Sequence, residues 1–360
     1  MPTPINERLQ ALRLKHLFRE RKIRPQGLCF SSNDYLGLAQ DPLLIDAFCE
    51  GAYRYGIGAT GSALVSGYSR AHRALETAFS DHVQRDRALL FSNGYMANAA
   101  VLQALLGKED TVFQDKLNHA SLLDGTKLAG ARLKRYRHRD AAHLNQLLST
   151  HHNGQKMVVS DHVFSMGGDI APMAALIETV RQHQATLLID DAHGFGVVDF
   201  PYAQEAVPIL VCPLGKAFGG SGALVAGSHE MIESLIQFAR PYLFSTALSP
   251  ALAHALHQSL KLMQTQPWRR EKLLENIAYF KHTTAAMGLP FLDSDTGIQM
   301  LLIGDNARAE AISNALCKRR LFVRAIRPPS VPHAALRITL SSRHDPAEIH
   351  FLLREIQALL

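Results

Sequence analysis

Short apolar runs that alternate with longer helical patterns constrain the fold of this sequence more than any other feature. Stretches with apolar residues at helical spacing, such as residues 71–83 and 101–106, stand between these runs. Continuous apolar strands alternating with helices are typical of a parallel sheet that helices cover on both faces. The pattern therefore predicts an α/β fold with a mostly parallel sheet. The runs lie at residues 88–91, 111–113, 157–160, 187–190, 209–211 and 223–226.

The pattern changes after about residue 250, where a long helical stretch is followed by shorter elements. The last helix is predicted from its first residues, with Asp345 as N-cap, Pro346 in the first helical position and Glu348 completing a capping box. We expect an N-terminal helical arm, a large domain and a smaller α+β domain. Their expected bounds are residues 1–32, 33–249 and 250–360.

Composition excludes several classes of protein. The chain has 360 residues, of which 47% are apolar, enough for a large core rather than general disorder. No run approaches the roughly 18 apolar residues that a membrane span needs. The net charge of +6 is spread along the chain and identifies no ligand. Four widely spaced cysteines and the lack of a signal-peptide core indicate a cytoplasmic protein.

Residues 56–61 read GIGATG and formally satisfy the dinucleotide-binding pattern GxGxxG. That pattern requires a strand before it and a helix opening at it. Residues 43–53 are helical in pattern, so we reject a nicotinamide cofactor. The glycines indicate a loop with unusual backbone angles, and a loop on the substrate side of a site remains open.

Acidic side chains and a histidine follow one apolar run, in the sequence LLIDDAHG at residues 187–194. Ligands of open α/β sheets bind outside the carboxyl ends of strands, where these groups would lie. Two other interpretations stay open at this point. Asp190 could cap the following turn beside an exposed His193, or Asp190, Asp191 and His193 could hold a divalent cation.

A single lysine, Lys216, stands among glycines and apolar residues in the sequence LGKAFGGSG at residues 214–222. Desolvation lowers the pKa of such a lysine and makes its amine nucleophilic, which suits a Schiff base with a carbonyl. Together with Asp190 it meets the requirements of pyridoxal 5′-phosphate (PLP), an amine and a carboxylate for the pyridine nitrogen. Gly94 follows another strand and opens a helix whose N–H groups could hold a phosphate.

The sequence resembles the α-oxoamine synthases, PLP-dependent acyltransferases of the aspartate-aminotransferase fold class (fold type I), over roughly residues 5–355. The resemblance implies a homodimer with a shared active site and no metal. It is carried by FSSNDYLGL at residues 30–38, VSGY at 65–68, HASLL at 119–123, VFSM at 163–166, DDAHG at 190–194 and AIRPP at 325–329.

The resemblance also implies roles for particular residues. Lys216 would join the cofactor, and Asp190 would keep its pyridine nitrogen protonated. The expected cofactor contacts are His193 and Ser165 near the ring oxygen, His119 stacked on the ring and touching substrate, and Gly94 and Tyr95 at the phosphate. Asn33 would lie near the substrate end, and Arg19 and Ser330 would contact the acyl substrate. Arg337 would bind the carboxylate of the amino acid, a partner that a guanidinium fork suits.

Within the family, the motifs are most similar to the branch that condenses L-alanine with a pimeloyl thioester, of coenzyme A or a carrier protein, in biotin synthesis. Sister branches use glycine with acetyl- or succinyl-coenzyme A, or serine with palmitoyl-coenzyme A. The glycine enzymes commonly have an arginine where Ser62 is followed here by Ala63. The basic residues 134–139 lack a nucleic-acid motif and would at most steer an acidic carrier or coenzyme A.

One departure from the family pattern concerns the phosphate. The family usually has a threonine three residues before the lysine, and here that residue is Pro213, which has neither a hydroxyl nor an N–H. Ser245 and Thr246, from this subunit or its partner, could replace the missing contact. The departure predicts weakened cofactor binding, and a cofactor-poor, non-catalytic relative is the alternative.

Overall fold

The computed structural model describes residues 4–21, 23, 26–150 and 154–360. The chain divides into two compact units. Unit 1 comprises Met1–Tyr35, Ser165–Asp169 and Trp268–Leu360, and unit 2 comprises Leu36–Phe164 and Ile170–Pro267. The domain bounds expected from the sequence stay predictions.

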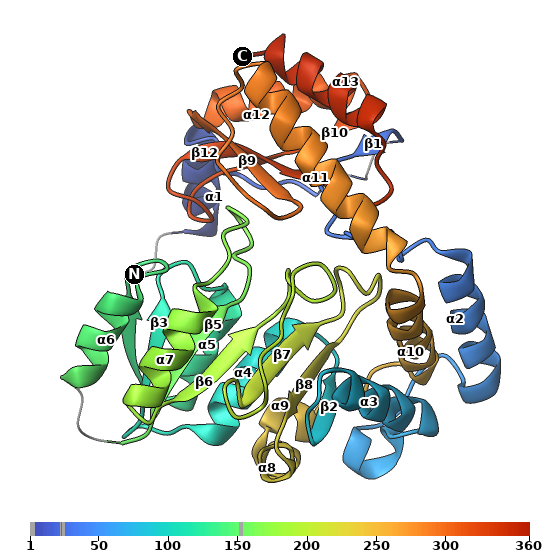
Figure 1. Cartoon of the computed structure of the whole chain (residues 1–360), viewed down its shortest axis with the longest axis vertical. Coiled ribbons are helices and arrows are strands. Elements are labelled where there is room, and N and C mark those ends of the chain that lie inside the picture. The colour runs from blue at the N-terminus through green and yellow to red at the C-terminus, as the bar shows by residue number, and fades with distance from the viewer. Residues whose placement is uncertain (1–3, 22, 24–25, 151–153) are drawn as a thin grey trace. The chain divides into compact units, whose positions relative to one another are not determined.

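Among the described residues, unit 2 is built on a seven-stranded sheet (Figure 1). Five neighbouring strands run parallel, and one strand, β8, runs antiparallel to both of its neighbours. The expected mostly parallel sheet is confirmed. In spatial order the strands are β2 (Arg87–Phe91), β8 (Ala223–Gly227), β7 (Ile209–Pro213), β6 (Thr186–Asp190), β5 (Lys156–Asp161), β3 (Thr111–Asp115) and β4 (Arg132–Tyr136).

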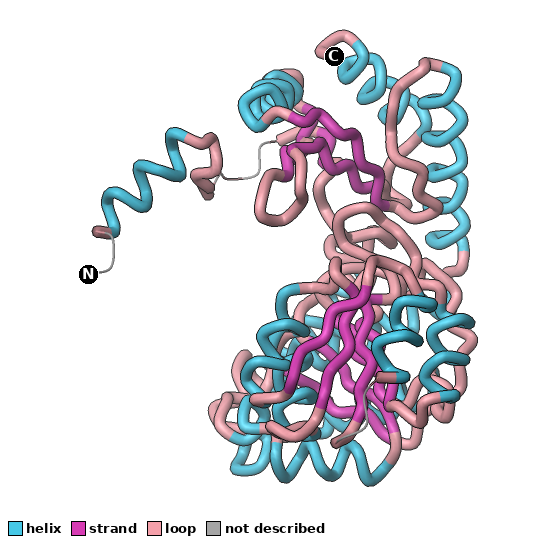
Figure 2. Tube along the Cα trace, turned by 90° about the vertical axis from the view of Figure 1, so that its left-hand side faces the viewer, coloured by secondary structure: helices cyan, strands magenta, loops and turns pink. Residues whose placement is uncertain are grey.

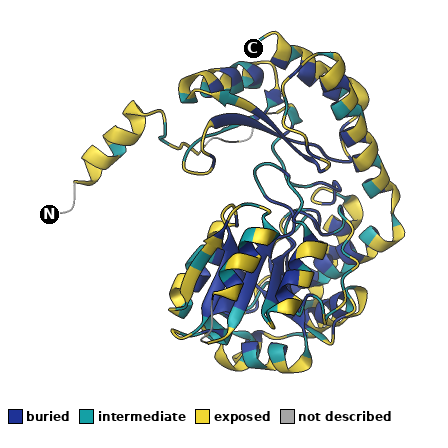
Figure 3. Ribbon diagram, turned by 60° about the vertical axis from the view of Figure 1, so that its left-hand side comes forward, coloured by how far each residue is buried: buried dark blue, intermediate teal, exposed yellow. Residues whose placement is uncertain are grey.

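Helices cover both faces of this sheet, and the strands lie buried between them (Figures 2 and 3). Successive residues of a strand point to opposite faces, so Leu187 and Ile189 join one core and Leu188 joins the other. The helical segments are α2 (Pro42–Tyr55), a π-helical turn (Ala63–Gly67), α3 (Arg70–His82), α4 (Gly94–Leu105), α5 (Ala120–Ala129), α6 (Ala141–Ser149), α7 (Met173–Gln182), α8 (His229–Phe238), α9 (Arg240–Leu243) and α10 (Pro250–Thr265).

Helix α10, expected to open the small domain, packs against α2 and α3 of unit 2. The reason lies in its apolar face, because Ala253, Leu256 and Leu260 are buried in one of the two cores of that unit.

Helix α2 ends before residue 56, so the GIGATG loop follows a helix and not a strand. The predicted helix before this loop is confirmed, so the loop lacks the preceding strand that a nicotinamide fingerprint requires.

Unit 1 contains a three-stranded antiparallel sheet, with β12 between β11 and β9, and a short parallel pair of β1 with β10. The last helix begins as expected, because Asp345 and Glu348 form a capping box around Pro346. The elements are α1 (Ile5–Leu14), β1 (Leu28–Cys29), α11 (Trp268–Ala286), β9 (Ile298–Gly304), α12 (Asn306–Lys318), β10 (Leu321–Phe322), β11 (Arg324–Ile326), β12 (Ala334–Thr339) and α13 (Pro346–Gln357).

Helix α1 differs from its sequence-based expectation. Its leucines predict an apolar face packed on the rest of the domain, but Leu12 and Leu14 are exposed and no residue of the helix is buried (Figure 3). The arm is attached after this helix, where Arg327 donates hydrogen bonds to the backbone carbonyls of His16 and Phe18. An amphipathic pattern identifies an apolar face but not the surface that covers it.

Candidate active site

Asp190 is the last residue of β6 and is 3% exposed. Its two carboxylate oxygens each accept a hydrogen bond. Asn98 Nδ2 lies 2.6 Å from Oδ2, and the N–H of Ala192 lies 3.0 Å from Oδ1. The second bond shows that Asp190 does cap the turn after the strand. A carboxylate has about four acceptor positions, so this one can accept a further N–H.

Asn98 was not anticipated from the sequence, although its position offered a signal. It lies one helical turn after Gly94 on α4, and residues four apart share a helix face. The same Nδ2 donates to Ser121 Oγ at 2.9 Å, and Ser121 Oγ lies 2.7 Å from Nδ1 of His119. A continuous hydrogen-bond network therefore connects Asp190 to His119.

His119 is the N-cap of α5. Burial of the ring lowers the pKa of His119. The charge of Asp190 raises this pKa, and the charge of Lys216 lowers it. The N–H of Ser121 also points at Nδ1, over 3.4 Å. Since this N–H can only donate, Nδ1 is the acceptor and the neutral ring carries its proton on Nε2. His119 therefore provides a neutral imidazole.

A second carboxyl group, Asp161, ends the neighbouring strand β5 and lies opposite Asp190 in the sheet register. It is buried and accepts a hydrogen bond from the N–H of His119 at 3.2 Å. Burial and then the charge of Asp190 raise the pKa of Asp161 well above its usual value. Two buried carboxylates side by side cannot both ionise cheaply, which favours the protonated form of Asp161.

Lys216 lies on the loop between β7 and β8. The loop is closed by the N–H of Leu214, which donates to the carbonyl of Gly222 at 2.9 Å. Gly219 has φ +71°, and a Cβ there would lie 2.5 Å from the backbone nitrogen of Ala39, so only glycine fits this turn. The half-buried Lys216 lowers the pKa values of both His119 and Asp161. The ammonium group therefore lies within electrostatic reach of both side chains.

The first turn of α4 offers backbone donors. Asn93 caps the helix by accepting from the N–H of Met96 at 2.8 Å. The N–H groups of Gly94 and Tyr95 have no acceptor within the described structure, which makes this helix start suitable for a phosphate. A Cβ on Gly94 would lie 2.7 Å from the ring of Pro213. Pro213 therefore occupies space beside the expected phosphate position. The Tyr95 hydroxyl donates away from it, to Asp124.

The alternative of a divalent cation held by Asp190, Asp191 and His193 is not supported by the arrangement of these three side chains. Asp191 pairs with His162 at 2.6 Å, with both side chains buried, and His193 lies buried in the turn that follows. Gly194 makes this packing possible, because a Cβ there would lie 2.2 Å from Asp191 Oδ1. No group of three His, Cys, Asp or Glu side chains suited to a metal is found in the described part of the chain.

Unit 1 holds the residues expected to bind the amino acid. Arg337, on β12, is 7% exposed and donates from Nε to the carbonyl of Ser165 at 2.7 Å. Its two terminal nitrogens each lie 3.2 Å from Asn33 Oδ1, which also accepts from the Tyr35 hydroxyl. Both acceptors of Arg337 are uncharged. A buried cation without a counter-charge is costly, so this guanidinium is suited to receive an anion.

Arg19 and Ser330, the expected acyl contacts, also meet within unit 1. A terminal nitrogen of Arg19 lies 3.4 Å from Ser330 Oγ, at the edge of a pocket of about 240 Å³. The two residues are 311 positions apart in the chain. Both lie at the surface, unlike Arg337.

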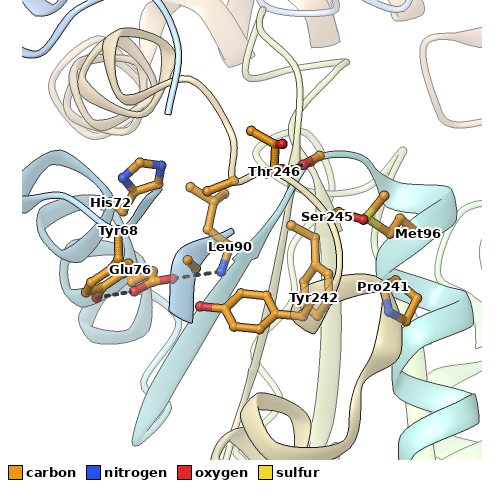
Figure 4. A pocket seen from close by; sticks show the side chains of 13 residues that line it. Tyr68, His72, Glu76, Leu90, Met96, Pro241, Tyr242, Ser245 and Thr246 are labelled. Carbon is orange, nitrogen blue, oxygen red and sulfur yellow. Dashed lines mark hydrogen bonds between the residues drawn. The ribbon is translucent and has the colours of Figure 1, made fainter. Parts of the chain in front are cut away.

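Ser245 and Thr246 line a separate, small pocket of unit 2 together with Met96 of α4 (Figure 4). Glu76 lies on another wall, accepting from the Tyr68 hydroxyl at 2.7 Å and from the N–H of Leu90 at 2.9 Å. Burial raises the pKa of Glu76 to about 7. The pocket volume of about 20 Å³ suits a water molecule rather than a substrate.

Comparison with known proteins agrees with this architecture. Residues 25–356 match the model of the aminotransferase class I and II family. The chain therefore belongs to this family, which is the class that the fold and the site define.

More particular similarities follow. The 8-amino-7-oxononanoate synthase of Pseudomonas syringae pv. tomato is 47% identical, covering 99% of this chain and 96% of that protein. The solved structure of the Francisella tularensis 8-amino-7-oxononanoate synthase has 31% identity and a TM-score of 0.80, covering 92% of this chain and 97% of the other. A serine palmitoyltransferase variant of S. paucimobilis, solved with a PLP–myriocin aldimine, has 27% identity and a TM-score of 0.90, covering 99% of this chain and 96% of the other. Within its family the chain thus belongs with the 8-amino-7-oxononanoate synthases, and the resemblance found in the sequence is confirmed.

Proposed function

We propose that this chain catalyses the PLP-dependent condensation of L-alanine with a pimeloyl thioester, with loss of carbon dioxide, as a step of biotin synthesis. The observation that carries the proposal is the grouping of Lys216 with the hydrogen-bond network from Asp190 to His119. The 47% identity to an 8-amino-7-oxononanoate synthase supports the choice of substrates.

The residues of unit 2 fit PLP. Asp190 is a fixed, buried acceptor for the pyridine N–H, and the unpaired N–H groups of Gly94 and Tyr95 offer donors to the phosphate. Lys216 supplies the amine that joins the aldehyde. His119 supplies a neutral ring, and His193 is a proposed contact of the ring oxygen. Ser165, the other proposed contact of that oxygen, belongs to unit 1. Pro213 stands where the family usually has a threonine, and it cannot donate the expected hydrogen bond to the phosphate.

Three protein groups serve the removal of the α-proton in the proposed reaction. Bound PLP supplies an electron sink for the negative charge that develops at Cα of alanine. Asp190 holds the pyridine proton, which keeps that sink strong. Lys216 Nζ removes the α-proton, acting as a general base, and Arg337 is the proposed partner of the alanine carboxylate. A bond forms between Cα and the thioester carbonyl carbon while the carbon–sulfur bond breaks and the thiol leaves. The bond from Cα to the carboxylate then breaks with loss of carbon dioxide, and a proton returns to Cα to give the aminoketone.

We also propose a homodimer and a cytoplasmic location. Ile57, Leu64 and Val65 expose large apolar side chains on one stretch of unit 2, as expected of a surface that a second copy covers. Among the helices of the described residues, none combines the length and apolarity that crossing a bilayer requires.

The proposed reaction is tested by supplying the PLP-loaded protein with pairs of substrates and identifying products by mass spectrometry. We expect L-alanine with pimeloyl-coenzyme A or the pimeloyl carrier protein to yield the aminoketone and carbon dioxide. Glycine with acetyl-coenzyme A and serine with palmitoyl-coenzyme A are the comparison pairs. Faster product formation from either of those pairs would assign the chain to a sister reaction.

Pro213 gives a further prediction. Pro213→Thr should tighten PLP binding about three- to tenfold, because one added hydrogen bond contributes about 0.5–1.5 kcal/mol. The smaller threonine side chain also fits beside Gly94, where the proline ring now packs. Fluorescence titration of the apo protein measures the dissociation constant, with Pro201→Thr, in an exposed loop, as the control. Equal PLP dissociation constants for wild type and Pro213→Thr would show that the proline does not weaken cofactor binding.

A further inference from the structure

The pocket that Arg19 and Ser330 border is also lined by charged side chains that are not among the expected acyl contacts. It is lined by three arginines, Arg19, Arg324 and Arg327, and by two glutamates, Glu20 and Glu310. Its volume of about 240 Å³ is below the roughly 300–1,000 Å³ of pockets that enclose a whole ligand. It is therefore suited to one end of a ligand.

Only one of these arginines is neutralised within the described structure. Arg327 forms an ion pair with Glu310 at 2.8 Å and also ties down the arm through the carbonyl of His16. The guanidinium of Arg324 lies 4.9 Å from the ring centre of Phe322 and has no carboxylate partner among the described residues. Stacking on an aromatic ring orients a guanidinium while leaving its N–H edge available.

The register of the sheet in unit 1 gives a second reason to expect a bound anion at Arg324. Arg324 on β11 lies directly opposite Arg337 on β12. Directly opposed residues of antiparallel strands have Cβ atoms about 4.5–5.5 Å apart on the same face, and like charges there are destabilising. Arg337 is turned to Asn33 and Ser165, whereas Arg324 lines the pocket. An oxyanion at Arg324 would offset the repulsion between the two guanidinium groups.

We propose that Arg324 determines specificity for an acyl donor whose chain ends in a carboxylate. This inference rests on the proposed function, because it takes Arg337 as the binding group of the amino acid. The new carbon–carbon bond joins the acyl carbonyl to that amino acid, so the far end of the acyl chain stays close to it. In a pimeloyl group, five methylenes separate the carbonyl from the terminal carboxylate. The phosphates of coenzyme A lie beyond the whole pantetheine arm and are the alternative oxyanion.

The test compares pimeloyl-coenzyme A with heptanoyl-coenzyme A, which has the same length and ends in a methyl group. Wild type, Arg324→Gln, Arg324→Lys and the exposed control Arg354→Gln are each examined as PLP-loaded protein. Calorimetric titration without alanine gives the dissociation constants of the two donors. Steady-state kinetics with alanine give kcat/KM for each donor.

We expect Arg324→Gln to weaken binding of the pimeloyl donor about 10- to 100-fold, the range of a charge-assisted hydrogen bond. Binding of the heptanoyl donor should stay within about twofold, Arg324→Lys should retain most of the preference, and Arg354→Gln should match wild type. Equal weakening of both donors would assign Arg324 to the phosphates or to packing and overturn the proposal. An unchanged preference in Arg324→Gln would overturn it as well.

The binding measurement separates this inference from the proposed function. If no aminoketone forms from any donor, but Arg324→Gln still removes the preference for the carboxylate in calorimetry, the proposed function fails and the pocket assignment stands. If product forms and the preference does not depend on Arg324, the pocket assignment fails and the function stands.

Discussion

Replacing Lys216 with alanine should abolish turnover, lowering kcat by at least about 1,000-fold, the scale expected when a covalent and general-base group is removed. In the proposed function Lys216 is the side chain that joins the cofactor, and its amine also takes the α-proton of alanine. Its loop is fixed by its glycines and by the closure between Leu214 and Gly222, so a smaller side chain should leave the backbone in place. Product formation from alanine and pimeloyl-coenzyme A measures the loss.

The matched control is Lys261→Ala, because Lys261 is an exposed lysine of the same unit. A second readout follows the cofactor itself. After borohydride reduction of the PLP-loaded protein, peptide mass spectrometry should find PLP on the peptide that contains Lys216, and no modified peptide should appear in Lys216→Ala. Modification of another lysine with retained activity would remove Lys216 from its proposed role.

The sequence was sufficient to predict the groups at the ends of single strands and loops. Asp190 follows an apolar run and Lys216 stands alone among glycines, so the neighbouring residues are enough to single out each of them. The order and direction of the strands were less accessible. Strand β8 runs antiparallel to its neighbours, yet its apolar run reads like those of the parallel strands. Burial on both faces gives the same pattern in either direction.

The partners of those groups depend on long-range geometry. Asp161 lies beside Asp190 because β5 and β6 are neighbours in register, and sequence spacing does not reveal that register. Asn98 reaches Asp190 across 92 residues, and Asn33 reaches Arg337 across 304. The resemblance named Asn33 and Arg337 separately, and the structure shows that they bind each other. The packing of helix α1 is hidden from the sequence for a similar reason, because its leucines predict an apolar face and yet none of its residues is buried in the described structure.

Replacing Asp190 with asparagine should lower kcat about 100- to 10,000-fold while leaving the fold intact. An amide cannot hold the proton on the pyridine nitrogen as a carboxylate does, so the electron sink weakens. The local hydrogen bonds also change, because Asn98 and Ala192 both present donors to Asp190. An asparagine side chain has one acceptor atom and would turn its NH₂ toward one of those donors. Activity and the cofactor absorption spectrum, recorded across pH, measure the effect.

A structural role for Asp190 predicts a different set of results. Because a buried charge is costly to maintain, its removal should change the melting temperature of the apo protein little, whereas loss of a structural carboxylate would lower it. Asn98→Ala provides the graded comparison. It removes one hydrogen bond to Asp190 but keeps the carboxylate, so kcat should fall only about tenfold, close to the value of a single hydrogen bond to a charged group. If Asp190→Asn retained most of the activity, or lost activity only in step with its stability, the pyridine nitrogen would not depend on this carboxylate. The assignment of the cofactor site would then have to begin from a different acid, and Asp161 is the one that the sheet places beside it.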